Sequence, residues 1–150
     1  MKVDFLSAAD KKELIRKLEE TYGIKELPFL LFRIGRDKIR AYSGMFSREE
    51  LMEIGRHVNV EILGIYLFKI ENDGVRISHD ALSILKNQII KNIIELNSEQ
   101  ANEWLKGSDL QIKAQKSFVV IKHNALILGC GKSTGEKITN FVPKERRIKG

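Results

Sequence analysis

Apolar residues recur at helical spacing in two segments of the N-terminal half, and each segment follows a capping signal. The first begins at the capping box Ser7-Ala-Ala-Asp10 and stops at Gly23, and its apolar positions are Leu14, Leu18 and Tyr22. The second begins at the capping box Ser47-Arg-Glu-Glu50, and its apolar face comprises Leu51, Ile54, Gly55 and Val58. Phe46 precedes this box and is placed to contact Leu51 as a hydrophobic staple. The pattern predicts two helices.

Other segments of this half are rich in β-branched and aromatic residues. Residues 29–34 and 38–42 flank a turn at Gly35 and predict a β-hairpin, and residues 60–70 predict a further strand. Asn72-Asp73-Gly74 is a strong turn signal before a short apolar run at residues 75–77. We place a domain boundary at this turn, so that residues 1–73 form a small α+β domain and residues 74–150 a second domain.

The second half begins with a short helical turn and is otherwise mostly β. Residues 81–85 predict that turn, whereas the isoleucine pairs at 89–90 and 93–94 fit a helix or a strand by spacing; we assign the second pair to a strand. Ser98 is placed to cap a helix that Gly107 ends. Strands are then predicted at 118–121, 125–128 and 138–142, the first two joined by a turn at 123–124. The predicted fold class is therefore α+β.

Composition excludes several classes of protein. The chain has 150 residues, of which 43% are apolar and 31% charged, as in folded globular proteins of one or two compact domains. No run of about 18 apolar residues lacks a charge, and the start shows no signal-peptide pattern, so we expect a cytoplasmic protein without a membrane partner. The single cysteine, Cys130, and three scattered histidines predict neither a disulfide framework nor a metal site.

Positive charge is concentrated near the C-terminus. The formal net charge is +6; residues 107–150 hold nine Lys or Arg against three Asp or Glu, while residues 1–106 hold 17 of each sign. An excess of positive charge confined to one domain is typical of a nucleic-acid surface, although lysine-rich surfaces are often only solvated.

A glycine-rich stretch at residues 128–135 is compatible with two interpretations. Gly131-Lys132-Ser133 matches the end of a phosphate-binding P-loop, but that motif needs a glycine where Leu126 stands and a helix after Ser133. We therefore expect no nucleotide cofactor, and no other cofactor. The alternative is the end of a strand followed by a glycine-rich turn.

Taken this way, the stretch resembles a known family. Residues 128–148 resemble the C-terminal PUA-like tail of the Sun/Fmu type of rRNA 5-methylcytosine methyltransferases, which has a glycine-rich turn, a Lys-x-x-Asn-aromatic-x-Pro-Lys motif and a basic cluster. The matching residues are Gly129, Gly131, Lys132, Gly135, Lys137, Asn140, Phe141, Pro143, Lys144, Arg146 and Arg147. Upstream, residues 103–110 (EWLKGSDL) resemble the helix that precedes the PUA strands. The resemblance covers residues 75–150.

The resemblance implies that residues 74–150 form a PUA-like mixed β-barrel that binds RNA. The implied RNA-binding residues are Gly131, Lys132, Lys137, Asn140, Phe141, Lys144, Arg146 and Arg147. Cys130 departs from the family pattern, since an aromatic residue is expected there. The methyltransferase core is also missing: Cys130 lacks the Pro-Cys context of the nucleophile, so we expect no enzymatic activity.

A small α+β domain before a PUA barrel resembles stand-alone archaeal PUA proteins of ribosome biogenesis. We therefore expect a non-catalytic protein that docks on structured rRNA or tRNA, with ribosome-assembly or RNA-modifying proteins as further partners. The alternative is a protein-interaction adaptor in ribosome assembly, in which the basic residues serve only solubility.

Overall fold

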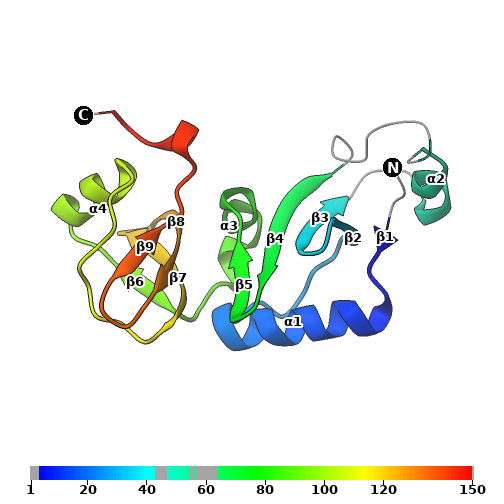
Figure 1. Ribbon diagram of the computed structural model, residues 1–150, viewed down its shortest axis with the longest axis horizontal. Helices are drawn as coiled ribbons and strands as arrows, with labels where there is room; N and C mark the ends of the chain where they lie inside the picture. The colour runs from blue at the N-terminus through cyan, green and yellow to red at the C-terminus, as the bar shows by residue number, and fades with distance from the viewer. Residues whose placement is uncertain (1–3, 43–46, 55, 57–63, 150) are drawn as a thin grey trace.

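The computed structural model describes residues 4–42, 47–54, 56 and 64–149, which form two lobes, each with its own sheet (Figure 1). The helices are α1 (Ala8–Tyr22), α2 (Arg48–Ile54), α3 (His79–Leu85) and α4 (Ser98–Leu105), with short 3-10 turns η2 (Lys86–Gln88) and η3 (Lys144–Arg146). The predicted α+β class is confirmed. No described helix has the length and apolar character needed to cross a bilayer.

The N-terminal lobe, residues 4–89, contains a five-stranded antiparallel sheet in the order β1-β2-β3-β4-β5. Its strands are β1 (Asp4–Phe5), β2 (Leu30–Ile34), β3 (Lys38–Tyr42), β4 (Ile65–Glu71) and β5 (Gly74–Ile77). Helix α1 begins where the side chain of Ser7 accepts a hydrogen bond from the Asp10 amide, and it ends at Gly23 with a left-handed φ of 87°. Leu14, Leu18 and Tyr22 face the core, as predicted.

The second capping box is also confirmed, because Ser47 and Glu50 exchange hydrogen bonds between side chain and backbone at the start of α2. The apolar face of this helix includes the buried Leu51. The predicted positions Phe46, Gly55 and Val58, and residues 60–63 of the expected strand, lie outside the described residues.

The C-terminal lobe, residues 91–149, contains a four-stranded sheet in the order β6-β7-β8-β9. Its strands are β6 (Ile93–Glu95), β7 (Ser117–His123), β8 (Leu126–Ser133) and β9 (Ile138–Asn140). Only the β6–β7 pair is parallel. Helix α4 is capped by Asn97, which forms a capping box with Gln100; the predicted cap, Ser98, is the first helical residue. The predicted barrel is not confirmed, because the described strands do not close on themselves.

The expected domain boundary at residues 72–74 lies inside the first sheet. This turn joins β4 to β5, which pair from Glu71 and Gly74 onward, so the strong local turn signal marks a hairpin. The chain passes from the first sheet to the second after α3 and η2, between β5 and β6. Figure 1 shows α3 between the sheets.

The interface between the lobes has an apolar centre. Phe118, Val120 and Cys130, from β7 and β8, join the core of the N-terminal lobe, which includes Tyr22 and Val75. Val119 and Ile121 point the other way, into a second core around the fully buried Trp104. One face of the β7–β8 hairpin therefore packs on the N-terminal lobe.

Candidate nucleic-acid interface

Two of the sequence-predicted RNA-binding residues are buried and hold the lobe together. The side-chain amide of Asn140 donates to the carbonyls of Trp104 (2.8 Å) and Ser108 (2.9 Å), and its oxygen accepts from the Val142 amide at 2.8 Å. Gly131 lies within β8, where an added Cβ would come within 2.8 Å of the Trp104 ring. Gly131 therefore allows close packing, and Asn140 forms hydrogen bonds with backbone groups.

The predicted glycine-rich turn differs from the structure at this point. Gly131, Lys132 and Ser133 continue strand β8, and the turn occupies residues 134–137. The hydroxyl of Ser133 donates to the carbonyl of Ala114 at 2.9 Å. Strand β9 follows this turn, so the helix N-terminus that supports phosphates in a P-loop does not follow Ser133.

Two of the predicted lysines are ion-paired. The ammonium of Lys132 lies 2.5 Å from the Asp73 carboxylate and 5.1 Å from the centre of the Phe118 ring. The hydrogen bond from Lys132 lowers the pKa of Asp73 below its usual value. The ammonium of Lys137 lies 3.4 Å from one carboxylate oxygen of Asp109. The other oxygen of Asp109 accepts a hydrogen bond from the backbone N–H of Asn140. The charge of each lysine is therefore partly neutralised within the protein.

The segment that follows β9 contacts both lobes and carries the remaining predicted residues. Phe141 lies beneath the guanidinium of Arg76 on β5, whose central carbon is 3.9 Å from the ring centre. Arg146 pairs with Asp80 on α3 at 3.0 Å. Arg147 donates to the carbonyl of Val142 and packs over Gly107, which has a left-handed φ of 101°.

Lys144 is a predicted RNA-binding residue whose side chain has no partner among the described residues. Its side chain is exposed, and it makes no hydrogen bond or ion pair with the residues that the structure describes. The same holds for Lys149 at the end of the segment. These two lysines are the free cations of the C-terminal segment, residues 141–149.

A first groove lies between this segment and the N-terminal lobe, and we call it the arginine–aromatic groove. It has a volume of about 260 Å³, and its lining includes Tyr66, Arg76, His79, Phe141 and Arg146. Burial lowers the pKa of His79, and the charge of Arg146 lowers it further, so the imidazole is predominantly neutral at pH 7. An arginine over an aromatic ring is a type of surface on which an unpaired base can stack, and Asp80 and Glu145 also line this groove.

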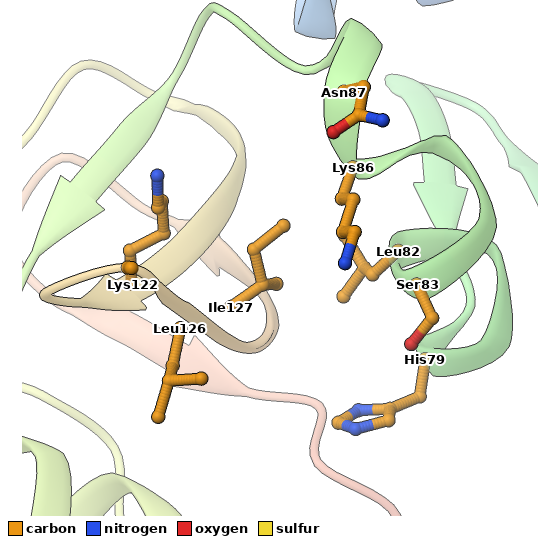
Figure 2. A pocket seen from close by; sticks show the side chains of 9 residues that line it. His79, Leu82, Ser83, Lys86, Asn87, Lys122, Leu126 and Ile127 are labelled. Carbon is orange, nitrogen blue, oxygen red and sulfur yellow. The ribbon is translucent and has the colours of Figure 1, made fainter.

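A second groove lies on the other side of His79, between α3 and the β7–β8 hairpin, and we call it the lysine groove. It has a volume of about 450 Å³ and is lined by His79, Leu82, Ser83, Lys86, Asn87, Lys122, Ala125, Leu126 and Ile127 (Figure 2). Sequence reasoning did not select Lys86, Lys122 or Arg76. Lys122 lies within the basic C-terminal region, but Lys86 and Arg76 carry no local signal.

Cys130 is an unreactive core residue. It is buried on β8, and burial raises the pKa of its thiol to about 11, so the thiol is neutral at pH 7. Cys130 therefore acts as a small hydrophobic residue of the core. Among the described residues, no three His, Cys, Asp or Glu side chains are grouped closely enough to hold a metal ion.

The C-terminal lobe is similar to a domain of known proteins. Residues 91–148 match a family model described as the methyltransferase RsmF PUA domain. The C-terminal lobe therefore resembles a PUA domain of the Sun/RsmF type. The match begins just before β6 and covers all four strands of the second sheet, so the resemblance expected from the sequence is confirmed for this lobe.

Three curated relatives are named ribosomal RNA small subunit methyltransferase F. The protein from Shewanella oneidensis is 32% identical over 124 residues, covering 80% of this chain and 25% of the relative. That from Aeromonas salmonicida is 24% identical over 143 residues, covering 93% and 28%. That from Vibrio campbellii is 32% identical over 90 residues, covering 55% and 19%. The chain thus spans between 19% and 28% of the length of these relatives.

Proposed function

We propose that this chain binds structured ribosomal RNA through its PUA-like lobe and has no catalytic activity of its own. The observation that carries the proposal is the PUA match over residues 91–148, which includes most of the basic region at residues 107–150. The names of the relatives support ribosomal RNA over transfer RNA as the target. We further propose a cytoplasmic location and a role in ribosome biogenesis or rRNA modification.

The charges of the C-terminal segment support this proposal. Lys144 and Lys149 are exposed and unpaired within the described chain, so they can neutralise phosphates without first breaking an ion pair. They flank Arg146 and Arg147, which the structure holds in fixed positions through Asp80 and Val142. Fixed arginines beside free lysines can position a phosphate backbone along the segment.

The burial of Cys130 supports a non-catalytic function. Methyl transfer to a cytosine carbon through a covalent intermediate needs an accessible thiolate, whereas this thiol is buried and has a pKa of about 11. Incubation of the pure protein with rRNA and labelled S-adenosylmethionine is expected to transfer no methyl group. Stoichiometric methylation would contradict this part of the proposal.

Crosslinking in cells tests the proposed target. The protein is crosslinked to total RNA, purified under denaturing conditions, and its bound RNA is sequenced. We expect enrichment of defined small-subunit rRNA segments over a control in which Lys144 and Lys149 are changed to glutamine. Enrichment of transfer RNA would mean that the target is transfer RNA and not ribosomal RNA. Recovery no greater than background would favour the adaptor alternative.

A further inference from the structure

The lysine groove contains two lysines, of which Lys122 lies opposite Glu95 of β6 in the strand pairing but forms no ion pair with it. Lys86 is exposed at the start of η2, and Lys122 is half-buried on β7; within the described chain, neither side chain makes a hydrogen bond or ion pair. None of the described residues that line the groove is Asp or Glu. By contrast, Lys132, Lys137 and Arg146 each pair with an aspartate. Within the described chain, Lys86 and Lys122 therefore lack the ion pairs that most of the cationic residues selected from the sequence have.

The position of Lys122 follows from strand geometry. Phe118 and Val120 face the N-terminal lobe, and alternation along β7 places Lys122 on the same face. A bulge in the β7–β8 pairing leaves Leu128 between the partners of Ile121 and Lys122, so Ile127 lies opposite Lys122. The bulge also reverses the alternation on β8: Leu128 joins the second core, whereas Ile127 packs toward the N-terminal lobe.

The two ends of this interface therefore differ in charge. At one end, Lys132 is paired with Asp73. At the other end, an open groove has Lys122 and Ile127 on its hairpin wall and Lys86 and Leu82 on its helical wall (Figure 2). An unpaired lysine lies on each wall, so an anion bound in the groove would be attracted by both charges.

The groove also has apolar residues on both walls and a suitable size. Its volume of about 450 Å³ lies within the range of about 300–1,000 Å³ that is usual for small organic groups. Leu126, at its edge, is 65% exposed. Ser83 and Asn87 add hydrogen-bonding groups on the helical wall. Phosphate-binding cations beside an apolar wall and polar groups are the features that a nucleotide requires.

We propose that the lysine groove binds an unpaired nucleotide of the RNA, with its phosphates between Lys86 and Lys122 and its base against Leu126 and Ile127. This proposal rests on the RNA-binding function proposed above. His79 lines both grooves, so a strand in the lysine groove continues past this residue into the arginine–aromatic groove.

Filter binding with transcribed small-subunit rRNA tests the proposal. The double variant Lys86→Gln, Lys122→Gln is expected to bind at least about tenfold more weakly than the unmodified protein. Two lost phosphate contacts should also make the slope of log affinity against log salt shallower by about 1.4–1.8. The matched control Lys12→Gln, Arg36→Gln removes the same charge from exposed positions of the N-terminal lobe and should change affinity by less than about twofold. Thermal melts of both variants should match that of the unmodified protein.

The outcomes separate the two proposals. If the groove variant binds like the control while Lys144→Gln, Lys149→Gln loses affinity, the groove proposal is wrong and RNA binding stands. If the unmodified protein binds no rRNA, both proposals fail. If a hexaglutamate peptide binds through Lys86 and Lys122 and rRNA does not compete, the groove recognises an acidic protein segment and the nucleotide proposal is overturned.

Ultraviolet crosslinking followed by mass spectrometry locates the bound RNA on the protein without relying on variants. Trypsin should release Ile77–Lys86 and His123–Lys132, which form the two walls of the groove. We expect nucleotide adducts on both peptides. Adducts confined to residues 138–149 would contradict the groove proposal even if the double variant had lost affinity.

Discussion

Lys132 and Asp73 form an ion pair at 2.5 Å across the interface between the two lobes. Asp73 lies in the β4–β5 turn and Lys132 near the end of β8, so this contact ties the first sheet to the second. It links a predicted RNA-binding lysine to the turn at which the sequence suggested a domain boundary. The contact is best explained as a structural one.

The stability contribution of this pair should depend on pH. The folded state lowers the pKa of Asp73, so the ion pair stabilises the protein above the ordinary pKa of an aspartate and loses its effect as pH falls through the lowered value. Asp73→Asn should therefore be slightly less stable than the unmodified protein at pH 7, by less than about 1 kcal/mol because the pair is partly exposed. Urea unfolding at several pH values measures this. A difference that persists in strong acid would exclude the ion pair as its cause.

The same contact predicts the response to proteases. The turn at residues 72–74 joins two paired strands and is held to β8, so it should resist limited proteolysis although Asn72 and Asp73 are exposed. Brief digestion with endoproteinase Asp-N, followed by mass spectrometry, tests this. Early cleavage before Asp73 would instead support the boundary expected from the sequence.

Asn140 should contribute to stability more than to RNA binding. Asn140→Ala removes three side-chain hydrogen bonds and leaves the carbonyls of Trp104 and Ser108 without this donor. We expect a loss of about 2–3 kcal/mol in the free energy of unfolding. Where the variant is still folded, its RNA affinity should be nearly unchanged. A large loss of affinity with unchanged stability would mean that Asn140 contacts RNA directly.

Cys130 should be unreactive in the folded protein. Its burial and its pKa of about 11 leave little accessible thiolate at pH 8. Iodoacetamide labelling followed by mass spectrometry should show modification only after denaturant is added. Rapid labelling under native conditions would show that β8 exposes the thiol.

The elements that the sequence predicts well depend on local signals. The caps at Ser7 and Ser47 and the stop at Gly23 act within a few residues, and the structure shows each of them. The α4 cap differs by one position because Asn97 and Ser98 are both good caps, and only Asn97 has Gln100 three residues later.

The features that local sequence signals do not reveal depend on distant contacts. A turn signal at residues 72–74 does not reveal that β5 returns to β4. Gly131 indicates a turn locally, but here it lets Trp104 pack closely against β8. Likewise, the aspartates that neutralise Lys132 and Arg146 are far away in sequence, so the free cations could not be separated from the paired ones before the structure was known.

The salt dependence of rRNA binding tests the central claim most directly. Affinity for transcribed small-subunit rRNA is measured by filter binding between low and moderate salt for the unmodified protein, for Lys144→Gln, Lys149→Gln and for Lys132→Gln. We predict that affinity falls steeply with salt. The slope should be shallower by about 1.4–1.8 in the double variant, but nearly unchanged in Lys132→Gln, whose lysine already pairs with Asp73. Absence of rRNA binding, or an affinity that does not change with salt, would contradict the claim that this PUA-like lobe binds RNA.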